Sequence, residues 1–473
     1  MAISSTGIGS GLDVTSIISQ LSALEKQPLK ALQTKAAKLQ TQLSTVSQIQ
    51  SQVAVLASAA TKLSSVLDWK GITSSSSNTS AVTVSATTAA TPSNFNVEVS
   101  ALAKAQSVAM PTTVGSPALP TSTEQLGYGK LTIQVGSKTP VEVTIADGKG
   151  TLTDIAKAIN AASGVGVTAT VMNDGTGKQN LLIRSNSTGT DGTFTITATE
   201  GTGGSISVPS NLSRLSYVAG SYNMAATQTA QNATMTVNGV AVSSQTNTFA
   251  DVVPGVTLTA AQLTTQPAVV TVARDTAAIT KNVQDFIAAY NALNSTLVEA
   301  TKYDATTGAA GVLQGDSVAT GLGNALRSVL GATINSGSTY TRASQLGITA
   351  ALGGALSLDA SKLTAAMAAD QDNTQKFFTA FNGSNEKNGF GVRVKDFVNG
   401  LLASTGTVTT KANAIQKALN TNAAAQNAVN AKATLFEERL KKQYSTLDAK
   451  MASLSALNSY VAQQVTTWNK SSS

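Results

Sequence analysis

Residues 29–67 read LKALQTKAAKLQTQLSTVSQIQSQVAVLASAATKLSSVL, and this stretch decides the fold class of the chain. Two lines of apolar residues run through it at a spacing of about seven residues. The first holds Leu32, Leu39, Val46, Val53, Ala60 and Leu67, and the second begins as Leu29, Ala36, Leu43 and drifts to Ile49, Leu56, Leu63. A straight helix drifts in this way against a seven-residue repeat. At ~1.5 Å per residue the stretch predicts one helix of about 58 Å.

A shorter helix is predicted immediately before the long one. Asp13 can accept hydrogen bonds from the first helical N–H groups, as N-cap residues do. The apolar positions that follow have helical spacing: Val14, Ile17, Ile18, Leu21 and Leu24. Pro28 cannot lie inside a helix but suits the first turn of one. We therefore expect a break or kink at Pro28.

The C-terminal end carries a stricter seven-residue pattern. Its two lines are Leu440, Leu447, Leu454, Val461, Trp468 and Tyr444, Met451, Asn458, Val465. Asn458 is the one polar member, and an Asn in such a seam usually fixes the register of a coiled coil. A helical hairpin inside one domain is the simpler interpretation of either end alone. Because both ends carry such seams, packing between molecules is favoured. The predicted assembly interface is Val14, Ile17, Ile18, Leu21, Leu24, Leu440, Tyr444, Leu447, Met451, Leu454, Asn458 and Val461.

Between the ends, the apolar period changes from helical to alternating. Strands are predicted at residues 81–87, 95–101, 130–135, 141–145, 165–171, 181–185, 193–197, 256–263 and 268–273. A helix with Thr151 and Asp154 in capping-box spacing interrupts them. Asn238-Gly239 predicts a two-residue hairpin turn. Helices return after Asp275, so the order helix, strand, helix indicates β-rich domains nested within a helical one.

Composition excludes most enzyme classes. The chain has no His and no Cys, and charged residues are only 12%. His- or Cys-based catalysis and Cys-ligated metal sites are therefore impossible, and neither an enzyme nor a cofactor is expected. Three loops that superficially resemble ligand-binding motifs lack the required spacing and are predicted to be turns or helix ends: Gly7/Gly9/Gly11, residues 175–178 and residues 370–373.

The charge and hydropathy patterns also argue against two kinds of partner. The net charge of +7 is spread over 473 residues without a basic patch interleaved with aromatic residues, so nucleic acid is not expected. Apolar runs such as Val53–Ala60 fall far short of a membrane span, so no membrane insertion is expected. The first basic residue is Lys26, which predicts a chain that stays in the cytosol or is exported without a cleaved signal.

Several segments resemble one family, the flagellar filament-capping, hook-associated proteins. SSTGIGSGLDVTSIISQLSALEKQPLKAL (Ser4–Leu32) is similar to the family's N-terminal signature, and ATMTVNGVAVSSQTNTFADVVPGVTLTA (Ala233–Ala260) is similar to the start of its C-terminal region. The match continues in Asn282–Leu297, Leu346–Leu363 and Arg439–Leu454. Gly129–Asn160 resembles a motif shared by flagellins and hook proteins. Departures concentrate in residues 105–225, where the family itself varies.

The resemblance implies an α+β multidomain fold with terminal coiled-coil helices, a helical leg and two nested β-rich outer domains. The expected segments are a terminal helix segment, 1–41, that pairs with a C-terminal coiled-coil helix, 405–473; a helical leg, 42–71 and 275–404; an inner β domain, 72–108 and 227–274; and an outer variable domain, 109–226.

The resemblance also implies a structural function. Members form a homo-oligomeric ring, expected here to be a pentamer, at the distal tip of the bacterial flagellum. They retain exported flagellin and promote its polymerisation beneath the cap, and some bind host mucin. The expected further partners are the hook–filament junction proteins and an export chaperone, and the expected location is outside the cell. The alternative is a surface adhesin on the same scaffold, whose loss would leave swimming intact.

Overall fold

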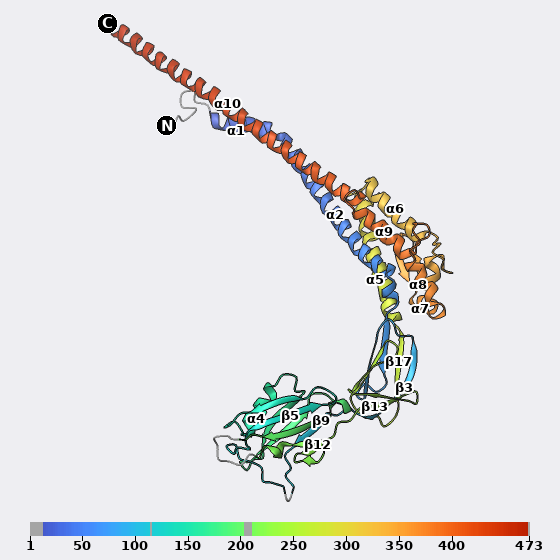
Figure 1. Ribbon diagram of the computed structural model, residues 1–473. Helices are drawn as coiled ribbons and strands as arrows, with labels where there is room; N and C mark the ends of the chain where they lie inside the picture. Colours follow the sequence, from blue (N-terminus) through green and yellow to red (C-terminus); the bar gives the residue numbers. More distant parts are fainter. Residues whose placement is uncertain (1–12, 114–115, 203–210, 472–473) are drawn as a thin grey trace. The chain divides into compact units, whose positions relative to one another are not determined.

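The computed structural model describes residues 13–113, 116–202 and 211–471 (Figure 1). The chain divides into a helical unit and a β unit by its internal contacts. The helical unit is formed by the two ends of the chain, up to Trp69 and from Thr276 onward, and the β unit is the stretch Lys70–Asp275. The predicted α+β multidomain class is confirmed. The predicted turn at Gly7, Gly9 and Gly11 lies outside the described residues.

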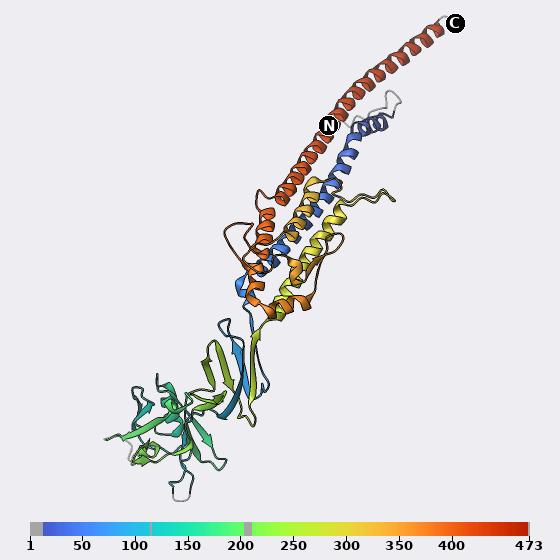
Figure 2. The same ribbon diagram turned by 90° about the vertical axis from the view of Figure 1, so that its right-hand side faces the viewer.

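Long helices dominate the helical unit, where α2 and α10 lie side by side (Figure 2). A small hairpin, β18 (Ile348–Ala350) and β19 (Leu356–Leu358), and one 3₁₀ turn, η3 (Ala343–Leu346), complete it. The helices are α1 (Val14–Glu25), α2 (Gln27–Ser64), α3 (Val66–Trp69), α5 (Thr276–Thr301), α6 (Ser317–Gly331), α7 (Ala360–Ala369), α8 (Gln371–Thr379), α9 (Phe390–Leu402) and α10 (Thr407–Ser471).

The long helix predicted over residues 29–67 is α2, and it ends at Ser64. Its two apolar lines become more buried along the helix, and Val46, Ile49, Val53, Leu56, Ala60 and Leu63 are all buried. Leu67, the last member of the predicted line, is instead 72% exposed. The helix ends before it, and the chain enters α3, which buries Trp69 in place of Leu67. The Trp69 indole N–H donates to the Leu63 carbonyl oxygen at 2.9 Å.

Aromatic rings form the centre of the helical unit. Phe377, Phe378 and Phe390 contact one another, with Phe377 and Phe390 stacked at 5.7 Å between ring centroids. Phe286 of α5 meets Phe390 edge to face at 5.7 Å, and Trp69 stacks on Phe378 at 4.6 Å. Aromatic pairs in these geometries stabilise the fold beyond what the burial of their apolar area contributes. The cluster therefore joins α3, α5, α8 and α9 into one core.

One part of the β unit is built from two antiparallel sheets around a shared core. The sequence predictions near residues 81–101 and 256–273 are confirmed as β2, β3, β16 and β17, with ends shifted by up to three residues. The five-stranded sheet has the order β1 (Ile72–Ser76), β17 (Ala268–Arg274), β3 (Ser93–Ala101), β13 (Ala233–Val237), β14 (Val240–Ser244), and the three-stranded sheet has the order β15 (Thr248–Val253), β16 (Val256–Ala260), β2 (Val82–Ala86).

The turn between β13 and β14 is the predicted Asn-Gly hairpin. Val237 pairs with Val240, which leaves Asn238 and Gly239 as the two turn residues. Their φ angles are 49° and 81°, both in the left-handed region that such turns require. Asn238 also fixes the neighbouring strand, because its Oδ1 accepts from the Asn96 N–H at 2.8 Å.

The other part of the β unit has its own core, covered by α4 (Leu152–Ala161). The Thr151 hydroxyl accepts from the Asp154 N–H at 3.2 Å and caps α4 as predicted. Short strands after residue 216 were not predicted, because two to four residues carry no period. The two sheets have the orders β11 (Ser221–Tyr222), β10 (Tyr217–Val218), β9 (Phe194–Glu200), β5 (Gly129–Val135), β6 (Val141–Ile145) and β12 (Ala225–Gln228), β4 (Ser107–Ala109), β8 (Gln179–Ser185), β7 (Val167–Asn173).

Candidate assembly interface

The start of α1 and its junction with α2 follow from three residues. The Asp13 Oδ1 accepts from the Ser16 N–H at 3.0 Å, so Asp13 caps α1 as predicted. α1 ends at Glu25, and α2 begins at Gln27 with Pro28 in its first turn. Pro28 has no N–H to donate, which costs nothing in a first turn but breaks a helix interior. The predicted break between the two helices is confirmed.

Only one face of α1 is buried. Val14 and Ile18 are buried together with Ser22, at a spacing of four residues. Ile17 is half-buried, whereas Leu21 is exposed and Leu24 is 60% exposed. The five predicted interface residues of α1 therefore differ in burial within one chain. Val14 and Ile18 are buried inside the molecule, whereas Leu21 and Leu24 are exposed at its surface and can contact another molecule.

α1 packs against α10, with charged residues beside the apolar contact. The Lys432 Nζ lies 2.9 Å from the Glu25 Oε2. Farther along, Ile18 and Ser22 of α1 and Lys441 of α10 contribute to a groove of about 600 Å³ between the two helices. The hydrogen bond and charge of Lys441, 2.7 Å away, lower the pKa of Glu437 at this groove. The two helices therefore run antiparallel and are held by apolar and ionic contacts.

The base of α10 is buried at positions that the sequence interpretation missed. Val408, Ile415 and Asn422 are buried and lie seven residues apart, and Ala433 is fully buried farther along. Ala433 continues the Leu440 line of the distal seam, whereas Val408, Ile415 and Asn422 form a separate line at the same seven-residue spacing, which the Asn and the many Ala residues of this stretch weaken as a signal. Within one chain Asn422 is buried, whereas Asn458 of the predicted seam is exposed. Its Oδ1 accepts from the Gln426 Nε2 at 2.6 Å, while its Nδ2 has no hydrogen-bond partner.

The distal part of α10 presents an apolar stripe to solvent. Leu440 and Tyr444 are half-buried, and from Leu447 onward every predicted seam residue is exposed. The distal stripe consists of Leu447, Met451, Leu454, Val461, Val465 and Trp468, which are between 40% and 77% exposed, with Asn458 among them. Steps of four and three residues place these side chains on one side of the helix, as in a coiled-coil seam. Such a stripe can bind another helix.

The arrangement holds no candidate metal centre or membrane span in the part of the chain that the structure describes. Residues 13–113, 116–202 and 211–471 contain no group of three acidic side chains close enough to hold a metal ion. Over the same ranges, no helix combines the length and the apolar character needed to cross a membrane.

Comparisons with known proteins identify related chains over nearly the whole length. Residues 10–106 match the family described as flagellar hook-associated protein 2 N-terminus, and residues 230–456 match its C-terminus. Flagellar hook-associated protein 2 of Escherichia coli K12 is 32% identical over 472 residues, 98% of each chain. The B-type protein of Pseudomonas aeruginosa is 29% identical over 95% of this chain and 94% of its own. The crystal structure of the flagellar cap protein FliD D1-D2-D3 domains from Escherichia coli covers 79% of this chain and 99% of that one, with 30% identity and a TM-score of 0.58.

Proposed function

The chain belongs to the flagellar hook-associated protein 2 family, and on that premise we propose that it caps the distal tip of the bacterial flagellar filament. A ring of identical copies, which we infer to be a pentamer, retains exported flagellin there and promotes its polymerisation beneath the cap. The similarity to the crystal structure of a flagellar cap protein from Escherichia coli supports this function. The division into terminal helices, a helical leg, an inner and an outer β-rich domain is part of the same proposal.

The exposed distal stripe of α10 is the observation that carries the proposal. Leu447, Leu454 and Val461 lie at intervals of seven residues on one side of the helix, and all three are exposed. Burying each such side chain fully is worth about 1.5–3 kcal/mol, so an uncovered stripe favours association with another helix. Leu21 and Leu24 of α1 add exposed apolar surface on the neighbouring helix. We propose that these residues contact neighbouring copies in the ring and the filament end.

The proposal fixes the partners and the location of the protein. The partners are other copies of the chain, flagellin, the hook–filament junction proteins and, before secretion, an export chaperone that keeps the distal helix from associating. The protein is exported and remains at the filament tip.

A cell-based experiment tests the capping function. A strain lacking the gene should make no filaments and release unpolymerised flagellin, and the wild-type gene should restore filaments. The variant Leu447→Ser, Leu454→Ser, Val461→Ser should fail to restore them while its helical unit melts as in the wild type. The matched control Ala449→Ser, Ala456→Ser, Gln463→Ser makes three substitutions on the other side of the same helix and should restore filaments. Normal filaments from the stripe variant would contradict the proposal.

The same gene loss separates capping from the alternative, a surface adhesin. An adhesin contributes to attachment, so a strain without it keeps its filaments and swims normally. Attachment of the cells to a mucin-coated surface then measures the mucin binding that the family resemblance implies as an additional function. Loss of mucin attachment with filaments intact would favour the adhesin and overturn the capping function.

A further inference from the structure

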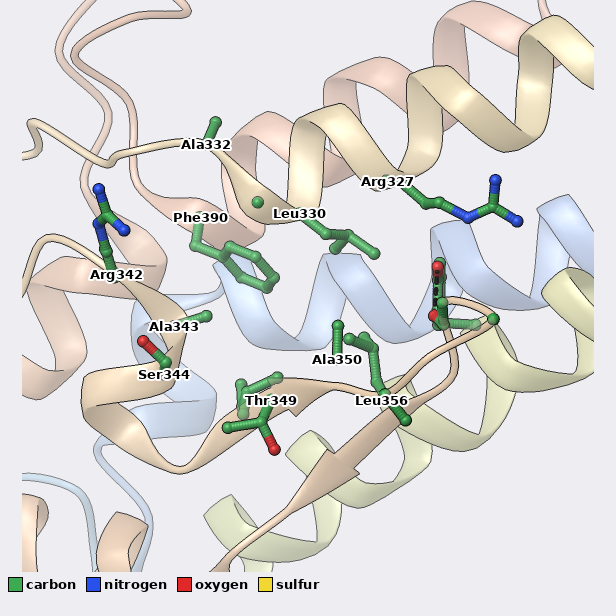
Figure 3. A pocket seen from close by; sticks show the side chains of 16 residues that line it. Arg327, Leu330, Ala332, Arg342, Ala343, Ser344, Thr349, Ala350, Leu356 and Phe390 are labelled. Atoms are coloured by element: carbon green, nitrogen blue, oxygen red, sulfur yellow. Dashed lines mark hydrogen bonds between the residues drawn. The ribbon is translucent and has the colours of Figure 1, made fainter.

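A groove of about 820 Å³ lies in the helical unit, away from the assembly interface (Figure 3). Its walls are the end of α6, the turn η3 and the hairpin formed by β18 and β19. Leu330, Ile348, Leu356 and Phe390 give the groove an apolar lining. Ile348, Leu356 and Phe390 are buried and Leu330 is half-buried, so this lining is part of the packed core and has a defined shape.

The hairpin wall is held in place by α5. The Tyr290 hydroxyl donates to the Gly354 carbonyl oxygen at 2.9 Å. Asn291 donates to the Leu356 carbonyl oxygen at 2.8 Å and accepts from the Leu356 N–H at 2.7 Å. Asn294 donates to the Gly353 carbonyl oxygen at 3.2 Å. Three side chains from two successive turns of one helix therefore fix the hairpin, and the groove is preformed.

Two arginines lie at opposite ends of the groove. Figure 3 shows Arg342 at one end and Arg327 at the other, with Leu330, Ala350 and Phe390 between them. No Asp or Glu lines the groove, and neither guanidinium forms an ion pair within the described ranges. Arg327 has only neutral acceptors, the Oδ1 atoms of Asn324 and Asn294, at 3.3 and 3.5 Å. Arginine forks bind carboxylates more strongly than such neutral, long contacts.

We propose that this groove binds a segment of flagellin that carries two carboxylates flanking apolar side chains. The inference rests on the proposed capping function, because it assigns a residue-level docking site for the subunit that the cap retains. The apolar lining receives the central side chains, and Arg327 and Arg342 each bind one carboxylate. This combination selects a segment by its charge at both ends and its apolar character between them.

The charge of this chain favours flagellin over a second copy as the occupant. The chain is net +7, so another copy brings further positive charge to a groove that already holds two guanidinium groups. Several of its own carboxylates already have lysine partners, including Glu25, Asp285, Glu299, Asp316 and Glu437. Carboxylates held in such pairs are less available to the groove of a second copy.

Binding of monomeric flagellin to the full-length chain tests the proposal. The probe is flagellin purified from the bacterium that encodes this chain, and the readout is the dissociation constant at low and at high salt. Arg327→Gln with Arg342→Gln should weaken binding about tenfold at low salt, as expected for two partly exposed ion pairs. Arg327→Lys with Arg342→Lys keeps both charges and should recover part of the loss. The control Lys376→Gln with Lys387→Gln removes two charges from exposed residues of the same unit outside the groove and should bind as the wild type does.

Three results would contradict the proposed docking site, and they can be told apart. Equal binding by the Arg327→Gln, Arg342→Gln variant and the wild type, with filaments still restored in cells, rejects the groove while the capping function stands. Loss of oligomers with unchanged flagellin binding would show that the groove receives a second copy. Failure of the wild type itself to restore filaments rejects capping, and the docking site with it. Unchanged thermal melting of the Arg variants excludes unfolding as the cause of any loss.

Discussion

Lys411, near the start of α10, forms an ion pair with Asp316, the residue that caps the N-terminus of α6. The Oδ2 of Asp316 faces the Lys411 Nζ, while its Oδ1 accepts from the N–H groups of Val318 and Ala319 at 3.0 and 3.1 Å. One carboxylate thus begins one helix and anchors the base of another that lies 91 positions later in the sequence.

Replacing Asp316 by Asn isolates the contribution of the charge. Asn caps helices as well as Asp does, so the variant keeps the cap and removes the ion pair. At pH 7 the free energy of unfolding of the helical unit should fall by about 1 kcal/mol, because the pair is partly exposed. Urea unfolding followed by Trp69 fluorescence, in a Trp468→Phe background, measures the change. An Asp316→Ala variant should lower the free energy of unfolding further, because it removes the helix cap as well as the ion pair.

The stabilisation contributed by the ionised Asp316 should decrease as the pH falls. Burial by itself raises the pKa of Asp316, but the hydrogen bond and charge of Lys411 and the N–H groups of Ala319 and Val318 outweigh it and hold the pKa below its ordinary value. The stabilisation is therefore complete above the unfolded-state pKa of about 3.9 and is lost as the pH falls through the folded-state value. The difference between wild type and Asp316→Asn should shrink below about pH 4, and a difference independent of pH would show that the charge is not involved.

Phe286→Ala should strongly destabilise the helical unit. Phe286 is fully buried and contacts Phe390 in the aromatic core. Removing a buried ring leaves a cavity, so the free energy of unfolding should fall by about 3–5 kcal/mol. Phe381 is 75% exposed, and Phe381→Ala should change the free energy by less than about 0.5 kcal/mol. Denaturant midpoints of the two variants give the comparison, and similar values for both would place Phe286 outside the core.

Two glycines with open surroundings should respond to alanine in opposite directions. A Cβ would meet no atom within 4 Å at either Gly239 or Gly321, so packing does not decide the outcome. Gly239 has a φ of 81°, which L-residues avoid, and Gly239→Ala should destabilise the β unit by about 1 kcal/mol. Gly321 lies inside α6, and Gly321→Ala should stabilise the helical unit by about 0.5–1 kcal/mol. Thermal melts in which the β unit and the helical unit are followed separately measure the direction of each change in stability.

Residues 72–274 should fold as an isolated fragment. Both β cores lie wholly within this stretch, and the β unit by internal contacts is Lys70–Asp275. A unit with its own cores does not need the helices, so the fragment should show β-type circular dichroism and melt cooperatively. A fragment without a melting transition would mean that the helical unit is required for folding.

The parts of the fold that the sequence predicted well are those with a long period or a specific turn residue. The apolar lines of α2, the Asn238-Gly239 turn and the caps at Asp13 and Thr151 each have a local physical cause. The ends of elements were less accurate, because tertiary contacts decide them. Leu67 continues the α2 pattern, yet the burial of Trp69 against Phe378 redirects the chain before that residue.

The helix faces that carry the predicted interface residues could be identified from the sequence, but their exposure could not. Periodicity identifies a face, and it cannot tell whether that face meets the same chain or another one. Val14 and Ile18 are buried within the chain, whereas Leu447 and Val461 are exposed, although all four fit the same kind of pattern. The groove between Arg327 and Arg342 had no sequence signal, because a hairpin held by three residues of α5 forms its wall.

Because α10 is one long unbroken helix, a small tilt at its base displaces its distal end by a much larger distance. Its 65 residues extend about 98 Å, and Leu447 lies about 60 Å from the first residue of the helix. Tilting the base by about 5° moves the start of the distal stripe sideways by about 5 Å, the rise of one helical turn. In the proposed ring, the alignment of the distal stripes between copies is consequently set far from the stripes themselves, where Val408, Ile415 and Lys411 attach α10 to the helical unit.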